Sequence, residues 1–263
     1  MERALLFRFH KNPEVCKNRL KLLKKLNPDT RIFGLGEDLD RMGKITGKLF
    51  EDNFVIDDKD SRWKWKNGDL AVRRWFKEFG NKISFDLLHV IEWDLLLFSS
   101  LKEAYKGISK DNVGITAPVP IKDIREKWPW ISEGNDWEKL LRFVKREFGY
   151  DKEPYGCAGP GVCLPRKFLK KYSKIDVPEL CNDEVRIPLF SQILGFELQD
   201  TGFCKRWFSK EECKYFNSIN KEIELSVIEE ELSKKSGRRV FHPYREKVDI
   251  ERLLKIKSRE ENF

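Results

Sequence analysis

The chain has 263 residues, of which 40% are hydrophobic and 37% are charged, as in a globular protein with a heavily solvated surface. The formal net charge of +8 suggests an anionic partner, but 52 basic residues are spread among 44 acidic ones, without the basic tract of a nucleic-acid-binding arm. No apolar run approaches the roughly 18 to 20 residues that span a bilayer, and the N-terminus is too charged for a signal peptide. We therefore expect a cytoplasmic protein, or one that lies peripherally at a membrane surface.

The six cysteines contain no Cys-x2-Cys pair, which argues against a zinc ribbon or finger. In a cytoplasmic protein the expected state is reduced, with the thiols in the core. Sequence alone leaves open two disulfides, Cys157 with Cys163 and Cys204 with Cys213.

The first elements form a βαβ unit. The apolar run Ala4–Phe9 predicts a strand, and Asn12-Pro13-Glu14 is a typical helix start. Leucines at near-helical spacing continue to Asn27-Pro28, where the helix ends. A second strand over Arg31–Phe33 then runs into Gly34-Leu35-Gly36. Ligands of open α/β sheets bind at such carboxyl ends of strands.

The remaining elements continue the alternation of strands and helices. Residues 40 to 68 are polar and predict irregular structure. Up to residue 119 we expect a helix over Asp69–Phe79, a central strand over Phe85–Glu92, a helix over Leu95–Tyr105 and a strand over Gly114–Val119.

In the second half we expect a helix over 137–148, a glycine-rich turn running into a short strand over Gly156–Leu164, a basic helix over Pro165–Tyr172, a helix over 185–194, a strand over Phe196–Leu198, a helix over 222–235, a last strand over Arg239–Pro243 and a helical tail. Neither an internal repeat nor a low-complexity linker interrupts the chain, which favours a single domain.

Two carboxylates stand at the end of the central strand, in His89-Val90-Ile91-Glu92-Trp93-Asp94. Burying an unpaired charge is costly, so each needs a partner. One interpretation is structural, with Asp94 capping the next helix and Glu92 pairing with an arginine. The other is a Mg²⁺ or Mn²⁺ site, in which carboxylates hold the ion while it bridges the phosphates of a substrate.

The order of these segments resembles that of nucleotide-sugar glycosyltransferases of the GT-A type. In that family a βαβ nucleotide-binding half leads to a central strand that ends in an Asp-x-Asp motif. Here Glu92-Trp93-Asp94 holds that place, with Glu in place of the first Asp. The resemblance covers roughly residues 3 to 243. It implies a single-domain, GT-A-like (Rossmann-like) α/β fold, with a mostly parallel central sheet flanked by helices.

The resemblance also implies site residues. Asp94, Glu92 and His242 would hold Mn²⁺ or Mg²⁺, and Asp183 and Glu184 would supply the carboxylate that deprotonates the acceptor, which favours inversion. The donor would contact a further set, Phe9, Gly34, Gly36, Glu92, Gly159 and Gly161. The implied halves are a nucleotide-binding part over about 1–105 and an acceptor part over about 106–244, followed by a charged tail over 245–263.

Each of these roles has a structural alternative. His242 can be a turn residue before Pro243, the Asp183–Glu184 pair a helix cap, Phe9 a core residue and the glycines plain turns. Three tryptophans could stack on an acceptor sugar, although burial in the core is the more frequent fate of this residue type; they are Trp128, Trp130 and Trp137. Arg166 and Lys167 could meet phosphate or acceptor, or be solvated.

The sequence thus favours a metal-dependent glycosyltransferase that moves a sugar from a nucleotide-diphosphate sugar to an acceptor hydroxyl on a glycan, lipid or protein. A sugar-phosphate nucleotidyltransferase is the nearest alternative, but such enzymes carry a glycine-rich loop after the first strand, where this chain has His10-Lys11-Asn12. A metal-dependent nuclease could use Asp86, Glu92 and Asp94, although Asp94 stands where a lysine is usual. A nucleic-acid-binding protein would explain the charge and leave the carboxylates unexplained.

Overall fold

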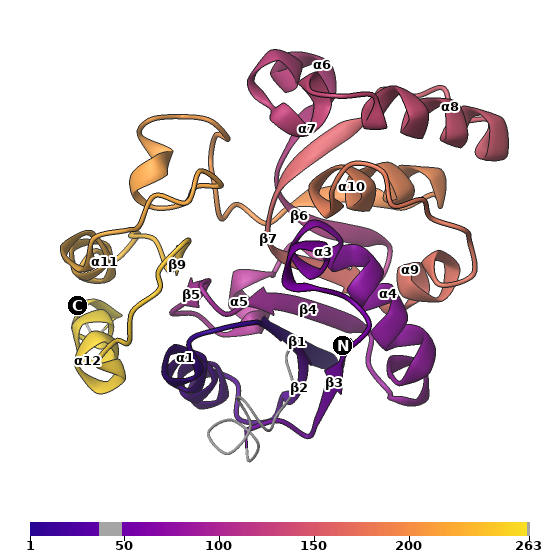
Figure 1. Ribbon diagram of the computed structural model, residues 1–263. Coiled ribbons are helices and arrows are strands. Elements are labelled where there is room, and N and C mark those ends of the chain that lie inside the picture. The colour runs from indigo at the N-terminus through magenta and orange to yellow at the C-terminus, as the bar shows by residue number, and fades with distance from the viewer. Residues whose placement is uncertain (37–48, 262–263) are drawn as a thin grey trace.

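The computed structural model describes residues 1–36 and 49–261, and a seven-stranded sheet lies at its centre (Figure 1). The strands are β1 (Arg3–Phe9), β2 (Arg31–Gly36), β3 (Asp52–Val55), β4 (Leu87–Glu92), β6 (Asn112–Pro120), β7 (Tyr155–Pro165) and β8 (Glu197–Asp200). Their order is β3-β2-β1-β4-β7-β6-β8. β7 runs antiparallel to β4 and β6, and the other neighbours are parallel. The predicted α/β fold with a mostly parallel central sheet is confirmed.

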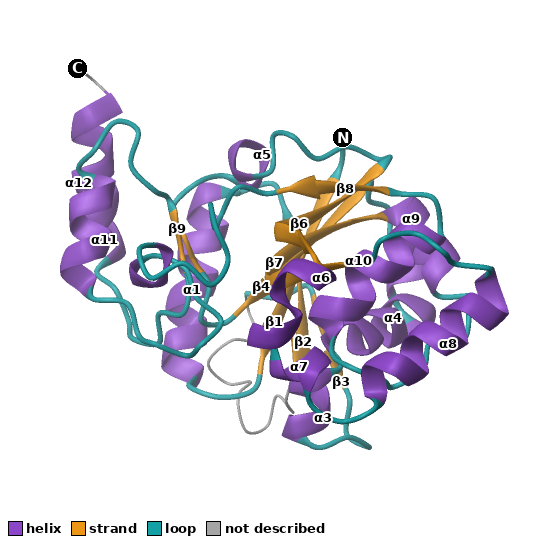
Figure 2. Cartoon of the chain, turned by 90° about the horizontal axis from the view of Figure 1, so that it is seen from above, coloured by secondary structure: helices purple, strands orange, loops and turns teal. Residues whose placement is uncertain are grey.

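Helices cover both faces of the sheet. They are α1 (Pro13–Leu26), α3 (Ser61–Lys66), α4 (Gly68–Glu78), α5 (Leu101–Ala104), α6 (Ile121–Ile124), α7 (Pro129–Ser132), α8 (Asp136–Phe148), α9 (Arg166–Tyr172), α10 (Asp183–Ile193), α11 (Leu225–Leu232) and α12 (Ile250–Glu261). The crossovers β1-α1-β2 and β3-α4-β4 move in opposite directions along the sheet, so right-handed connections place α1 and α4 on opposite faces. Figure 2 shows α4, α9 and α10 on one side of the sheet and α1 on the other.

A small second sheet joins distant parts of the chain. β5 (Leu96–Leu97) pairs antiparallel with β9 (Val240–Phe241). Around it lies a second apolar cluster, built from α1, β5, α11, β9 and α12: Leu22, Leu96, Phe98, Ile223, Ile228, Leu232, Phe241, Tyr244, Val248 and Leu253. This cluster fixes residues 240–253 against β5, the short strand that follows the carboxyl end of β4.

Most predicted elements occur where the sequence placed them, but the helix expected over Leu95–Tyr105 is wrong. β5 and the single turn of α5 take its place. The reason is burial on all sides, since Leu95, Leu96, Leu97 and Phe98 are each at most 1% exposed. A run buried all round is compatible with a strand, whereas an amphipathic surface helix would leave one face to water.

Three other expectations need correction. Residues 40–68 are not irregular throughout, because β3 and α3 lie there; residues 37–48 of that span lie outside the described part of the chain. The glycine-rich turn at Gly156–Leu164 is part of the continuous strand β7, which bends at Gly161 with φ of 82°. The strand expected at Arg239–Pro243 is shorter and belongs to the second sheet.

The C-terminal segment is helical, as expected, since α12 occupies most of it. In the parts of the chain that the structure covers, none of the helices combines the length and the apolar character needed to cross a bilayer. All six cysteines are free thiols.

Candidate active site

A cleft opens where the central sheet splits. β4 pairs with β7 from Leu87–Pro165 to His89–Cys163, and the register ends there, three residues before Glu92. Gly161, in the left-handed region, bends β7 at this point. Beyond the split lies a cleft of about 310 Å³ at the carboxyl end of β4. The carboxyl ends of β1 and β4 therefore face open space, as is usual for ligand sites in α/β sheets.

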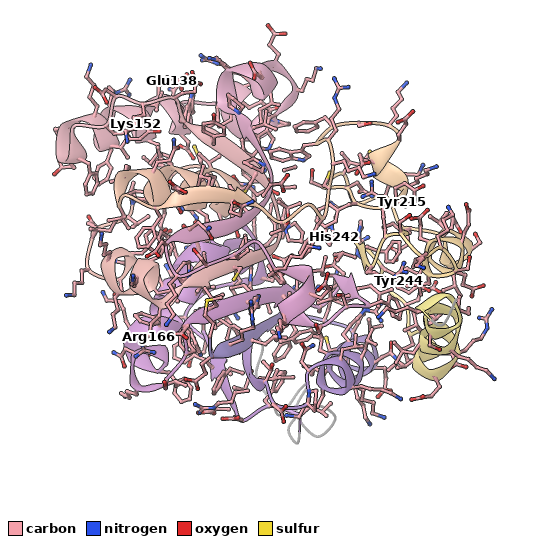
Figure 3. The ribbon with its side chains drawn as sticks, turned by 180° about the vertical axis from the view of Figure 1, so that it is seen from behind. Glu138, Lys152, Arg166, Tyr215, His242 and Tyr244 are labelled. Carbon is pink, nitrogen blue, oxygen red and sulfur yellow. The ribbon has the colours of Figure 1, made fainter. Side chains whose placement is uncertain are left out.

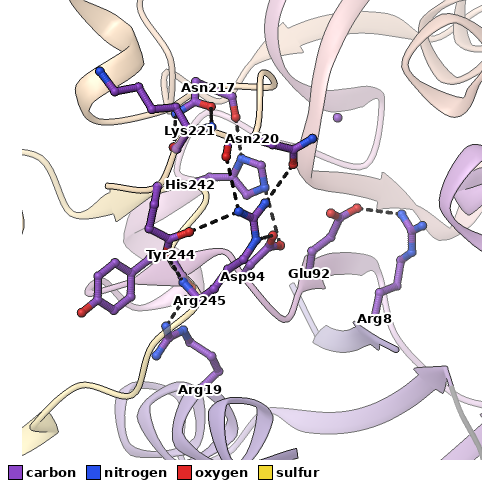
Figure 4. A network of polar contacts seen from close by, with 12 residues as sticks. Arg8, Arg19, Glu92, Asp94, Asn217, Asn220, Lys221, His242, Tyr244 and Arg245 are labelled. Atoms are coloured by element: carbon purple, nitrogen blue, oxygen red, sulfur yellow. Dashed lines mark hydrogen bonds and ion pairs between the residues drawn. The ribbon is translucent and has the colours of Figure 1, made fainter. Parts of the chain in front are cut away.

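Glu92, Asp94 and His242 converge at this edge. The pairing of β5 with β9 brings the segment after β9 alongside Asp94, whose carbonyl accepts a hydrogen bond from Tyr244 N at 2.9 Å. His242 Nε2 then lies 3.6 Å from Asp94 Oδ1 (Figure 4). One ligand atom from each of the three residues lies within 4.8 Å of the other two. The structure thus places His242 beside Asp94, although more than half of the chain separates the two residues in sequence.

The Asp94 carboxylate is strongly held in its ionised form. Burial opposes ionisation, but the facing His242 and Arg245 outweigh it and lower the pKa of Asp94 to about 2. Arg245 Nε lies 3.4 Å from Asp94 Oδ2 (Figure 4). Burial lowers the pKa of His242, and the attraction of Asp94 more than reverses this, so that its pKa is raised. His242 Nδ1 donates to the carbonyl of Asn217 at 2.8 Å, which turns Nε2 toward Asp94.

Glu92 has an arginine partner, as the structural interpretation of the sequence proposed. Arg8 stands opposite Glu92 in the β1–β4 register, and its Nη1 donates to Glu92 Oε1 at 2.8 Å. The same Nη1 lies 3.4 Å from Asp183 Oδ2. Arg8 therefore links the strand-end carboxylate to the start of α10.

Asp183 and Glu184 occupy the first turn of α10 and line the cleft. Glu184 is fully engaged, since Oε1 accepts from Gly159 N at 2.9 Å and Oε2 from Asn182 Nδ2 at 3.0 Å. Burial raises the pKa of Asp183 to about 8, opposed by Arg8 and assisted by nearby carboxylates. Burial likewise raises the pKa of Glu184 to about 7. Such shifts are typical of groups that exchange protons near neutral pH.

A proline inside α10 frees a backbone carbonyl in this turn for a contact with β7. Pro188 has no N–H, so the carbonyl of Glu184, four residues earlier, loses its helical partner. The thiol of Cys157 on β7 lies 3.5 Å from that carbonyl oxygen and donates to it. This contact ties the helix start to the strand that forms the opposite wall of the cleft.

The residues predicted to contact the donor fall into two groups. Phe9 and Gly36 line an apolar recess that adjoins the cleft and shares Glu92 and Trp93 with it, and Gly159 lines the cleft itself. Gly34 lies outside both linings, where a Cβ would strike Asn53 at 2.1 Å. Gly161 faces Phe203, and its carbonyl accepts from Tyr105. Gly34 and Gly161 therefore serve close packing and the bend of β7.

Other residues singled out in the sequence lie elsewhere. Trp128 and Trp137 are core residues, each 3% exposed. Arg166 donates to carbonyls of the Gly80–Ile83 turn, and Figure 3 shows it well away from His242. Lys167 pairs with Asp111 at the surface. Asp86 pairs with Lys110 at the other end of β4 from Glu92, which removes it from the acidic cluster that a nuclease would need.

Several cleft residues were missed from the sequence. Arg8, Trp65, Lys66, Asn182 and Arg245 all border the cleft or the adjoining recess. A partner for Glu92 was expected without being identified, and the parallel register opposite the strand end would have pointed to Arg8. The others come from loops and short helices, where no local pattern indicates a site.

Comparisons with known proteins give a distant likeness. No family model and no curated protein matches the sequence. The galactosyltransferase LgtC, in complex with donor and acceptor sugar analogs, is similar at 15% identity and a TM-score of 0.37, over 66% of this chain and 60% of that one. The bifunctional glycosyltransferase WbbM, in its apo structure, is similar at 7% identity and 0.44, over 92% of this chain and 45% of that one. The apo form of the glycosyltransferase GlyE of Streptococcus pneumoniae TIGR4 is similar at 13% identity and a TM-score of 0.37, over 76% of this chain and 45% of that one.

The chain thus spans between about half and three fifths of the length of these solved structures. The resemblance to glycosyltransferases stated from the sequence is confirmed as a resemblance. At such scores and identities, neither activity nor substrates transfer from these proteins to this chain.

Proposed function

We propose that the protein is a metal-dependent glycosyltransferase that moves a sugar from a nucleotide-diphosphate sugar to an acceptor hydroxyl. The observation that carries the proposal is the convergence of Glu92, Asp94 and His242 beside a cleft whose other wall bears Asp183 and Glu184. A metal-ligand set and a pair of proton-exchanging carboxylates on one cleft match the two demands of this reaction, namely a stabilised leaving group and an activated hydroxyl.

The donor set fits a divalent cation. Two carboxylates and an imidazole suit Mn²⁺, and the oxygens also suit Mg²⁺. The His242 tautomer with hydrogen on Nδ1 leaves the Nε2 lone pair toward Asp94. When bound, the cation would neutralise charge on the departing diphosphate.

The adjoining recess fits the nucleoside. Phe9, Leu35, Gly36 and Ile56 give it an apolar lining next to Glu92. Phe9, which lines the recess, stacks on Phe50 with ring centroids 5.5 Å apart. In this proposal the part of the chain up to about residue 105 binds the donor, and the part over about 106–244 shapes the acceptor side together with Trp65 and Lys66 of α3.

Asp183 is the better base of the acidic pair. Both oxygens of Glu184 already accept hydrogen bonds, whereas Asp183 Oδ1 has no hydrogen-bond partner among the residues that the structure describes. In its ionised form, which the raised pKa of about 8 makes a stronger base than an ordinary carboxylate, Asp183 would take the proton of the acceptor hydroxyl as that oxygen attacks the sugar carbon, an arrangement that favours inversion. Glu184, held by Asn182 and Gly159, would keep Asp183 in place through the shared helix turn.

A thermal-shift panel tests the proposal. The chain is heated with nucleoside diphosphates and nucleotide sugars, in Mn²⁺ and in EDTA. A ligand at about 100 times its Kd adds about 2.7 kcal/mol to the free energy of unfolding, which is roughly 5 to 10 °C for a chain of this size. We expect at least one diphosphate to give such a shift in Mn²⁺ and much less in EDTA.

Two variants sharpen the panel. Asp94→Asn should lose the metal-dependent part of the shift, and Asp183→Asn should keep it, because Asp183 serves the acceptor. Equal shifts in Mn²⁺ and EDTA would contradict a metal-bridged donor site. A nucleotidyltransferase would instead release pyrophosphate from a nucleoside triphosphate and a sugar phosphate, which a pyrophosphate assay detects.

A further inference from the structure

An exposed pair of tryptophans borders the cleft. Trp65, in α3, is 56% exposed, although most aromatic side chains of this protein are buried. Its ring centroid lies 5.4 Å from that of Trp130 in α7. At this separation the two rings touch, so nothing fits between them, and their planes meet at 49° to form an angled aromatic surface. Both line the cleft that holds Asp183.

A second groove leads away from the cleft past this surface. It has a volume of about 270 Å³ and shares Lys66 and Trp130 with the cleft. The rest of its lining is Pro129, Glu133, Asp136 and Cys181. Because Cys181 directly precedes the Asn182–Glu184 turn, the groove starts on the side of the cleft that bears Asp183. Of the two tryptophans, Trp65 also borders the apolar recess, whereas Trp130 does not.

The groove combines an aromatic face with charges of both signs. Lys66 Nζ lies 5.7 Å from the Trp130 ring centroid and 3.3 Å from Asp136 Oδ2. Pyranose rings match such a surface, since they carry C–H bonds on a face and hydroxyls around the edge. A lipid chain would desolvate the Lys66–Asp136 ion pair and Glu133 without offering any of them a hydrogen bond. An extended peptide would seek main-chain partners, whereas the groove is lined by side chains from α3, α7 and α8 and from the residues that flank α7 and α10.

We propose that the acceptor is a carbohydrate, one ring of which stacks on the Trp65–Trp130 surface while the next unit enters the groove toward Asp136. This inference rests on the proposed function and names the acceptor class of the same site. It also separates the three tryptophans that the sequence grouped together, since Trp128 and Trp137 are buried and Trp130 alone of the three lines the cleft.

Binding of the full chain to a printed oligosaccharide array tests the inference. The array is probed in Mn²⁺ with the nucleoside diphosphate that gives the largest thermal shift. We expect binding to a subset of oligosaccharides, weakened roughly 3- to 10-fold in Trp65→Ala or Trp130→Ala, the scale of one aromatic contact. Trp130→Phe should recover part of the loss.

Trp63→Ala is the matched control. Trp63 lies in the same helix as Trp65 but lines a different surface groove, where its Nε1 donates to Glu179. If no oligosaccharide binds, or if both cleft variants bind as the wild type does, the carbohydrate acceptor is wrong. Capture of acyl-lipid vesicles or peptides that depends on Trp130 would also overturn it. Metal-dependent nucleotide binding, measured separately, decides whether the proposed function itself stands.

Discussion

Replacing Arg245 should make the protein bind bare Mn²⁺ more tightly. In the structure Arg245 Nε lies 3.4 Å from Asp94 Oδ2, on the carboxylate that we propose as the main metal ligand. The guanidinium is held there by Asn220 Oδ1 at 2.8 Å and by Glu222 Oε2 at 3.2 Å. A side-chain cation therefore neutralises Asp94 and competes with any metal ion that approaches. Arg245→Met removes the charge and keeps most of the apolar stem.

The magnitude follows from the distance and the exposure. At 3.4 Å the Coulomb attraction is about 1.2 kcal/mol in water and about 5 kcal/mol at an effective dielectric constant of 20. The Arg245 side chain is 26% exposed and Asp94 is 10% exposed, so the effective value lies between these limits. Glu222 already offsets part of the Arg245 charge. A net gain of about 1–2 kcal/mol remains, which is roughly 5- to 30-fold in affinity.

The assay is a Mn²⁺ titration without nucleotide, followed by the electron paramagnetic resonance signal of the free ion. Arg252→Met is the control, because it removes the same charge from the Arg252–Glu229 pair at the protein surface. Arg245→Met should also lower the melting temperature in EDTA, since it leaves Asp94 with one fewer partner, and Mn²⁺ should restore it. An unchanged or weaker Mn²⁺ affinity in Arg245→Met would refute the competition between the guanidinium and the metal.

Three further predictions concern the neighbouring groups. Because burial raises the pKa of Asp183 to about 8, the folded wild type keeps a proton that the unfolded chain releases near pH 4. The contribution of this bound proton to the stability of the folded state is complete below pH 4 and is lost as pH rises through 8. In urea unfolding, the free energy of unfolding of the wild type should therefore fall relative to that of Asp183→Asn by on the order of 3–5 kcal/mol between pH 5 and pH 9. Parallel pH profiles of the two proteins would contradict this. His242→Gln should weaken Mn²⁺ binding by roughly 10-fold or more, and wild-type affinity should fall as pH drops through the raised pKa of His242; a pH-independent affinity would argue against imidazole ligation. Gly68→Ala places a Cβ 2.2 Å from Arg8 Nη1 and 2.3 Å from Asp183 Oδ2, so it should cost about 1–3 kcal/mol in unfolding experiments, whereas Gly107→Ala, with no atom nearer than 3.7 Å, should be nearly neutral.

The sequence by itself determined the scaffold and the strand-end carboxylates. The βαβ unit and the central strand follow from local periodicity, and the cost of burying Glu92 and Asp94 indicates that partners must exist. The sequence also predicted the correct type of partner for Glu92, an arginine. That reasoning needs no long-range information, because the requirement arises within a few residues of β4.

Only the tertiary structure decided which groups meet these carboxylates. His242 and Arg245 reach Asp94 because β5 pairs with β9, and the apolar run that forms β5 resembles a buried helix when read locally. Likewise, Trp128 and Trp130 are two residues apart, yet the first is buried and the second lines the cleft. Side-chain direction in a short helical turn depends on what packs against it. The contacts that decide these placements join residues far apart in the sequence, such as Asp94 with His242, Trp65 with Trp130 and Trp128 with Trp207, and no local pattern encodes them.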